Sequence, residues 1–118
     1  MPPTFSIIVP SYNTQPRHLR EAVASALEQD ADVEVLIQDG ASSDVATQEV
    51  LRSFDDPRVR VVSEPDSGQS DALNRALRRA SGVWVIWLNI DDLLFPGALA
   101  AFATLSSARS LDYRARRG

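Results

Sequence analysis

Four short apolar runs alternate with segments of helical periodicity, and this alternation constrains the fold more than any other feature of the chain. The runs cover residues 5–9, 33–38, 59–62 and 83–88 and are rich in Val and Ile. They do not alternate apolar with polar residues, which is typical of strands that are buried on both faces. The pattern predicts an α/β fold, with a mostly parallel sheet and helices on both of its faces.

The predicted helices fill the segments between these strands, at residues 17–29, 44–54 and 69–80, and a last helix runs to about residue 105. Proline suits the first turn of a helix, so Pro16 is expected near the start of the first helix and Pro96 at the start of the last. Ser42 or Ser43 can cap the second helix.

We expect one domain over residues 1–105, followed by a frayed or disordered tail over residues 106–118. The tail is arginine-rich and loses the apolar periodicity of the preceding segments.

The composition excludes several classes of function. The net charge of −4 argues against a nucleic-acid partner. All 12 basic residues are arginine, and cysteine is absent, which rules out Schiff-base lysines, P-loop lysines, thiolate metal sites and disulfides. We recognise no signal peptide and no membrane-spanning run, and from these absences we expect a cytoplasmic protein.

Four polar clusters follow the four predicted strands, at residues 11–13, 39–44, 64–69 and 89–92. In a parallel sheet the carboxyl ends of the strands share one edge, and ligands bind outside that edge. No glycine-rich turn follows the first strand, so the dinucleotide-binding fingerprint is absent. We therefore expect a binding site at this edge that does not depend on a glycine-rich phosphate loop.

The adjacent carboxylates of Asp91 and Asp92 stand at the end of the fourth strand. Such a pair becomes favourable when a divalent cation lies between it and phosphate oxygens, and hard oxygen ligands suit Mg²⁺ or Mn²⁺. The alternative is that one of them caps the helix that begins near Pro96.

Four motifs together resemble the nucleotide-binding half of a family 2 glycosyltransferase with the GT-A fold. They are SIIVPSYNT at 6–14, VLIQDGASSD at 35–44, EPDSGQSDALNRAL at 64–77 and WLNIDDLLFPGAL at 87–99. The resemblance implies a Rossmann-like GT-A domain that binds a nucleotide-diphospho-sugar, UDP- or dTDP-linked, with Mn²⁺ or Mg²⁺ as cofactor. It also implies inverting glycosyl transfer, and it covers only the front half of such an enzyme.

The resemblance also implies roles for particular residues. In the family the first motif lies against the base, and the aspartate of the second motif accepts a hydrogen bond from the base. The third motif meets the nucleotide or the sugar, and the fourth holds the ribose and the metal. Carried onto this chain, the donor-binding residues are Pro10, Tyr12, Asn13, Asp39, Asp66, Gln69, Asn74 and Asp91, and the metal ligands are Asp92 and Asp91.

Two of these residues have a structural alternative, and two further polar residues in the same motifs can have a structural role. Tyr12 can be a rim aromatic that packs on the sheet edge. Asp39 can serve an Asx-turn at Asp39-Gly40. We expect Asp44 to have a structural role as a cap, and Arg75 can either offset phosphate charge or be a solvated helix residue.

No catalytic residue is assigned. Inverting transfer needs a general base, which lies in the acceptor half in the family, and the only acidic residue after Asp92 is Asp112, which we do not assign as that base. The chain is therefore expected to be a donor-binding half, or else a non-catalytic nucleotide-binding or interaction module. A phosphoacceptor signalling domain is disfavoured by the missing lysine. An uncovered sheet edge would favour a homo-oligomer.

Overall fold

The fold is built around a four-stranded sheet with the strand order β3-β2-β1-β4. The computed structural model describes residues 3–90 and 92–105. All three strand pairs are parallel, as the sequence predicts. The strands are β1 (Phe5–Ser11), β2 (Val33–Asp39), β3 (Val59–Ser63) and β4 (Trp84–Trp87). The helices are α1 (Pro16–Leu27), α2 (Val45–Ser53) and α3 (Gln69–Arg79), and residues 98–105 form a further helix.

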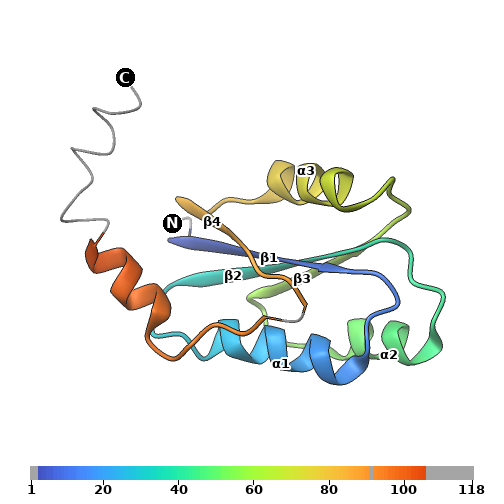
Figure 1. Ribbon diagram of the computed structural model, residues 1–118, viewed down its shortest axis with the longest axis horizontal. Helices are drawn as coiled ribbons and strands as arrows, with labels where there is room; N and C mark the ends of the chain where they lie inside the picture. The colour runs from blue at the N-terminus through green and yellow to red at the C-terminus, as the bar shows by residue number, and fades with distance from the viewer. Residues whose placement is uncertain (1–2, 91, 106–118) are drawn as a thin grey trace.

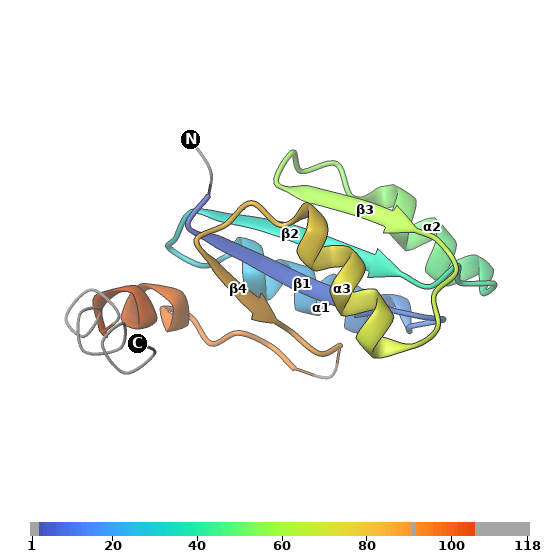
Figure 2. The ribbon, with the colours of Figure 1, turned by 90° about the horizontal axis from the view of Figure 1, so that it is seen from above.

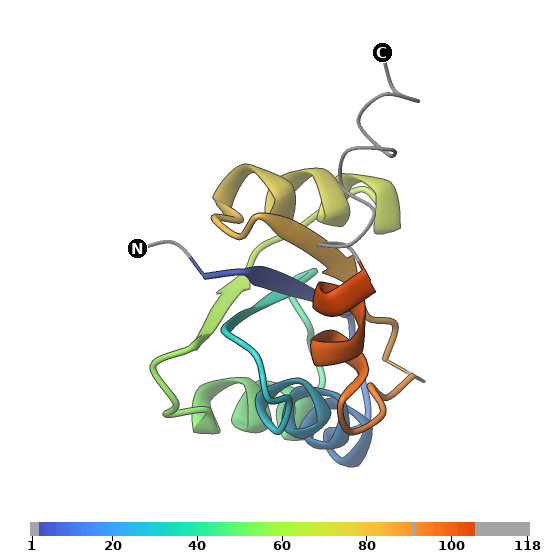
Figure 3. The ribbon, with the colours of Figure 1, turned by 90° about the vertical axis from the view of Figure 1, so that its left-hand side faces the viewer.

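Helices cover both faces of the sheet, which confirms the predicted layers. Figure 1 shows α1 and α2 below the sheet and α3 above it, and the end-on view of Figure 3 shows the same three layers. The strand order reverses at β1. The chain moves outward from β1 to β2 and β3, and α3 then carries it back across the sheet to β4 (Figure 2).

The main core lies between the sheet and the α1–α2 layer. Alternate residues of the central strands, Ile7 and Val9 of β1 and Val35 and Ile37 of β2, are fully buried there. The opposite face has a smaller core, in which Ala76 of α3 contacts Ile8 and Leu36. No helix in the described part of the chain is long and apolar enough to cross a membrane.

The starts of two helices correct expectations from the sequence, and the first of them also confirms the structural role expected for Asp44. The side chain of Asp44, rather than that of Ser42 or Ser43, caps α2 by accepting a hydrogen bond from the Thr47 amide at 3.0 Å. The last helix begins at residue 98 and not at Pro96, because Gly97 has a φ of +79° that interrupts helical geometry.

Ser25 of α1 and Gln29 of the turn after α1 hold residues 94–99, the segment that follows β4, by hydrogen bonds. The Leu94 amide donates to Ser25 Oγ at 3.1 Å, and Gln29 Nε2 donates to the Phe95 carbonyl at 2.9 Å. Gln29 Oε1 accepts from the Leu99 amide at 3.1 Å. Gln29 is available for this because α1 ends at Leu27, two residues earlier than the periodicity predicts. These contacts fix the path of the chain just beyond the Asp91-Asp92 motif.

A buried carboxylate joins β1, β2 and the α3–β4 turn at the opposite end of the sheet from the strand-end loops. Glu34 accepts hydrogen bonds from Ser6 Oγ at 2.5 Å, from the Ser81 amide at 2.7 Å and from Ser81 Oγ at 2.9 Å. Gly82 completes the turn, because a Cβ there would lie 2.6 Å from both the amide nitrogen and Oγ of Ser6. Burial by itself raises the pKa of the Glu34 carboxyl, but the hydrogen bonds from Ser6 and Ser81 outweigh it, and the pKa lies below its ordinary value.

This shift gives the first prediction. A depressed folded-state pKa means that Glu34 adds stability above the ordinary glutamate pKa, and that this stability is lost as the pH falls through the folded value. Glu34→Gln should lower the free energy of unfolding by about 1.5–3 kcal/mol at pH 7, as for hydrogen bonds to a charged group. The difference from the wild type should shrink below about pH 4. Urea unfolding at pH 7 and pH 3.5 measures both values, and a difference that does not depend on pH would contradict this role.

Candidate functional site

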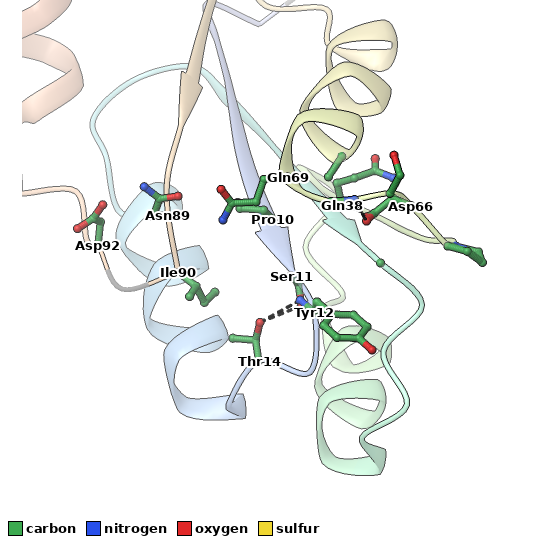
Figure 4. Close-up of a pocket in the computed structure, with 15 residues that line it drawn as sticks. Pro10, Ser11, Tyr12, Thr14, Gln38, Asp66, Gln69, Asn89, Ile90 and Asp92 are labelled. Atoms are coloured by element: carbon green, nitrogen blue, oxygen red, sulfur yellow. Dashed lines mark hydrogen bonds between the residues drawn. The ribbon is translucent and has the colours of Figure 1, made fainter.

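A cleft of about 1040 Å³ lies at the carboxyl ends of the four strands. Figure 4 shows Asn89 and Asp92 on one side of it and Gln38 and Asp66 on the other, with Pro10 and Gln69 between them. All four polar clusters contribute to the cleft. Its lining residues are Pro10, Ser11, Tyr12, Thr14, Gln38, Gly40, Pro65, Asp66, Ser67, Gly68, Gln69, Ala72, Asn89, Ile90 and Asp92.

The segment after β1 forms one end of the cleft. Tyr12 lines it with a side chain that is 66% exposed, so the aromatic face is open to solvent. The Tyr12 amide and Ser11 Oγ both donate to Thr14 Oγ1 at 3.3 Å, which holds the turn in place. An exposed ring beside a cleft suits stacking on a base, and the role of Pro10 and Tyr12 in base binding stays a prediction.

Asn13 connects the loop after β1 to the loop after β2. Its backbone has a φ of 48°, a left-handed conformation that asparagine tolerates better than most residues. Its Oδ1 accepts from the Ser43 amide at 2.8 Å and from the Asp44 amide at 2.9 Å, and its own amide donates to Ser42 Oγ at 2.8 Å. Asn13 does not line the cleft. These contacts give Asn13 a structural role. Direct contact between Asn13 and a nucleotide-sugar stays a prediction.

Asp39 is fully buried at the end of β2. Its Oδ1 accepts from Ser42 Oγ at 2.6 Å, and its Oδ2 accepts from the Ser42 amide at 2.9 Å and from Ser63 Oγ at 2.7 Å. Such a carboxylate has about four acceptor positions, so about one remains free. The side chain therefore has the structural role predicted as the alternative to base recognition, since it holds the turn after β2. A base can reach it only if this loop shifts, and that contact also stays a prediction.

The loop between β3 and α3 lies against the end of β2. Oδ1 of Asp66 accepts from the Gly68 amide at 3.0 Å. A Cβ at position 40 would lie 2.9 Å from Oδ2 of Asp66, so with a larger residue at position 40 this carboxylate would have to move. Gly68, with a φ of 124°, is the N-cap residue just before α3, and Gln69 projects into the cleft beside Pro10 (Figure 4). Asp66 and Gln69 therefore line the cleft, as the sequence predicts for this loop.

Arg75 and Asn74 do not line the cleft. Asn74 is exposed on α3. Arg75 forms ion pairs with Glu64 and Asp71, each at 3.0 Å, so its guanidinium is engaged by two carboxylates although the side chain is partly exposed. The pKa of Asp71 lies below its ordinary value, mainly because of the hydrogen bond from the Ser67 amide and, to a smaller extent, because of the one from Arg75. The hydrogen bond from Arg75 also lowers the pKa of Glu64. Contact between Asn74 and a nucleotide-sugar stays a prediction.

Asn89, Ile90 and Asp92 form the wall of the cleft beyond β4, while Asp91 lies outside the described residues. Oδ1 of Asn89 accepts from Trp87 Nε1 at 2.6 Å, so this oxygen already has a donor. The Asp92 amide donates to the Asn89 carbonyl at 2.9 Å. The Asp92 carboxylate accepts no hydrogen bond among the described residues, which leaves it available to the cleft.

The described residues contain no cluster of three or more His, Cys, Asp or Glu side chains that could enclose a metal. They do place the Asp92 carboxylate on the cleft wall. Magnesium sites commonly use one or two carboxylates and take their other ligands from substrate phosphates and water. The residues present therefore fit a cation shared with a phosphate ligand, and they do not fit an all-protein cage.

Two residues that shape the site were not anticipated. Gln38, only 1% exposed, lines the cleft from β2, and Arg79 Nε donates to its Oε1 at 3.2 Å. Arg79 Nη2 also donates to the Ile37 carbonyl at 2.7 Å. A glutamine inside an apolar strand run was the available signal, because a buried amide requires partners.

Comparison with known proteins identifies the family. The model of glycosyl transferase family 2 matches residues 6–109. A chondroitin synthase of Pasteurella multocida is 35% identical over 99 residues, which are 82% of this chain and 10% of that protein. The chain spans between 10% and 36% of the length of the curated relatives that it matches.

Solved structures agree with this match. S. aureus TarS residues 1–349, in complex with UDP-GlcNAc, superposes with a TM-score of 0.78 and 27% identity, covering 91% of this chain and 32% of that one. The mannosyltransferase PcManGT of Pyrobaculum calidifontis, in complex with GDP-Man and Mn²⁺, gives a TM-score of 0.65 and 31% identity over 83% of this chain and 30% of that one.

The hydrogen bonds of Asp39 give the second prediction. Asp39→Ala leaves the Ser42 amide and the hydroxyls of Ser42 and Ser63 without their acceptor, so the free energy of unfolding should fall by about 1–3 kcal/mol. Asp66→Ala removes a single bond at a half-exposed site and is the matched control, with an expected loss below about 1 kcal/mol. Urea denaturation measures both variants, and equal losses would show that Asp39 does not hold the loop.

Proposed function

The chain belongs to glycosyl transferase family 2, and on this premise we propose that its cleft binds a nucleotide-diphospho-sugar with a divalent cation, for inverting glycosyl transfer. The observation that carries the proposal is the meeting of all four strand-end clusters in one cleft. That the similar structures contain UDP-GlcNAc or GDP-Man with Mn²⁺ supports a nucleotide-sugar and a metal ion.

The two ends of the cleft suit the two ends of such a donor. The end near β1 and β2 has the exposed ring of Tyr12, the ring of Pro10 and the bare backbone of Gly40, a surface on which a planar base can lie. The end near β4 has the carboxylate of Asp92. We infer that the base binds at the first end and the diphosphate at the second, with uridine or thymidine as the nucleoside.

The diphosphate cannot lie directly against Asp92, because like charges repel. A cation between them, Mn²⁺ or Mg²⁺, resolves this conflict, and Asp92 together with Asp91 of the same motif would hold it. When bound, such a cation stabilises negative charge on a departing nucleoside diphosphate. The chain's own contribution is to place one carboxylate of this motif on the cleft wall, with the segment after it fixed by Ser25 and Gln29.

All the roles proposed for the described residues are on the donor side of the reaction. Inverting transfer also needs a group that removes the proton from the acceptor hydroxyl. Residues 93–105 contain no Asp or Glu, so the helix beyond the cleft supplies no carboxylate for this task. We therefore propose that this chain binds the donor and does not by itself perform general-base catalysis.

The third prediction is that nucleotide and metal bind together. Uridine diphosphate should bind at least about tenfold more tightly with Mn²⁺ than with a chelator, because a charged contact is worth about 1.5–3 kcal/mol. Asp92→Asn should abolish this difference. Asp55→Asn, at an exposed aspartate between α2 and β3, is the matched control and should bind like the wild type. Calorimetry with and without chelator measures these affinities, and equal wild-type affinity in both conditions would refute the metal assignment.

A further inference from the structure

A continuous network of hydrogen-bonded side chains connects α3 and β2 to the loop between β3 and α3. None of its hydrogen bonds is part of the base or diphosphate contacts proposed above. It starts at Arg79, in the last turn of α3, which donates to Gln38 of β2. Gln38 Nε2 then donates to Oε1 of Glu64 at 3.2 Å. Arg75 contacts the same glutamate oxygen at 3.0 Å, so the network returns to α3.

Arg75 joins the two ends of the loop that lines the cleft. Its Nη1 contacts Glu64, the residue just before Pro65, and its Nε donates to Oδ2 of Asp71 in the first turn of α3. The same Asp71 oxygen accepts from the Ser67 amide at 3.0 Å. One guanidinium therefore spans the cleft-lining segment 65–69, and through Asp71 it is connected to the backbone in the middle of that segment.

The chemistry of this contact requires arginine. A guanidinium presents several N–H groups in a rigid fork and can bond two carboxylates at once, whereas a lysine ammonium is a flexible point charge. The side chains of Arg75, Glu64 and Asp71 are 33%, 40% and 25% exposed, so the pairs are only partly screened by solvent. Several charges joined in a network also hold a geometry better than an isolated surface pair does.

We propose that Arg75 is a positioning residue, which holds residues 65–69 in their cleft-lining conformation before a donor binds. Arg75 itself does not line the cleft, so it acts through Asp71 and Glu64 on the backbone of the loop. The relevance of this to donor binding rests on the proposed function, whereas the effect on the loop does not.

Loss of this contact lowers the fraction of molecules whose loop is ready to bind. The apparent dissociation constant rises in inverse proportion to that fraction. For the loss of two partly exposed ion pairs we expect nucleotide affinity to fall about three- to tenfold. The metal dependence of binding should be unchanged, since Asp92 is on the other side of the cleft (Figure 4).

Amide hydrogen exchange tests the effect on the loop without any ligand. Arg75→Gln should accelerate exchange at Ser67 and Gly68 by about fivefold or more, while the amides of β1 and β2 keep their wild-type rates. Arg78 is an exposed arginine on the same helix, so Arg78→Gln is the matched control. It should change neither the exchange of the loop amides nor that of the strand amides. Glu64→Gln combined with Arg75→Gln should accelerate exchange no further than the larger single effect, because both act on one network.

Two more measurements make the outcome decisive. In 1 M salt the loop amides of the wild type should exchange faster, while those of Arg75→Gln should not respond, because the screened interaction is already gone. Glu64→Gln keeps the size of the side chain, removes one of the two carboxylates that pair with Arg75, and should reproduce the effect if Arg75→Gln does not fold. Wild-type exchange rates at Ser67 and Gly68 in both variants would overturn the proposal.

Calorimetry with uridine diphosphate and Mn²⁺ completes the test. A three- to tenfold weaker affinity for Arg75→Gln, with Arg78→Gln unchanged, is the expected result, and unchanged affinity despite a loosened loop would refute positioning. If the wild type itself binds no nucleotide, the proposed function fails, and the exchange rates still decide whether Arg75 holds the loop.

Discussion

Parallel pairing of the strands in one register is the constraint on which the rest of the structure depends. It places Ser11, Asp39 and Ser63 in a row across β1, β2 and β3, so the loops that follow these strands leave the sheet at one edge. The row continues into the loops, since the Gly40 amide donates to the Ser11 carbonyl and the Glu64 amide to the Asp39 carbonyl, both at 2.9 Å. A slip of one residue would turn every side chain to the opposite face and separate the polar clusters. The cleft therefore follows from the hydrophobic pattern of the strands, although no apolar residue of β1 or β2 lines it except Pro10.

At this edge the polar residues divide into those that line the cleft and those that hold the lining in place. Asn13 and Asp39 are held by hydrogen bonds within the protein and fix the backbone after β1 and β2. Tyr12 and Asp92 keep their side chains free for the cleft. Preorganisation of this kind reduces the entropy lost on binding, because the loops do not have to be ordered by the ligand. It also explains how a site without a glycine-rich phosphate loop can keep a defined shape.

Much of this arrangement could be predicted from the sequence. The uninterrupted apolar runs predicted the parallel sheet, and the polar residues after each run predicted the edge at which they meet. The exact task of each polar residue could not be predicted, because it depends on neighbours that are distant in the chain. Arg75 shows this clearly: helical periodicity puts it on an outward face, whereas the structure pairs it with Glu64, eleven residues earlier in the chain. The predicted start of the last helix at Pro96 is wrong for a local reason, because Gly97 has a left-handed backbone conformation that delays the helix to residue 98.

The central claim is that the four strand-end loops form one donor site with the base at the β1–β2 end and the metal and diphosphate at the β4 end. Nuclear magnetic resonance of the ¹⁵N-labelled chain, titrated with uridine diphosphate and then with trace Mn²⁺, tests this claim most directly. Nucleotide should shift the amides of Tyr12, Gly40 and Gln69, and paramagnetic broadening should be centred on Asn89 and Asp92. The turn between α2 and β3 should show neither effect. Broadening centred on the β1–β2 end, or shifts confined to a single loop, would contradict the account.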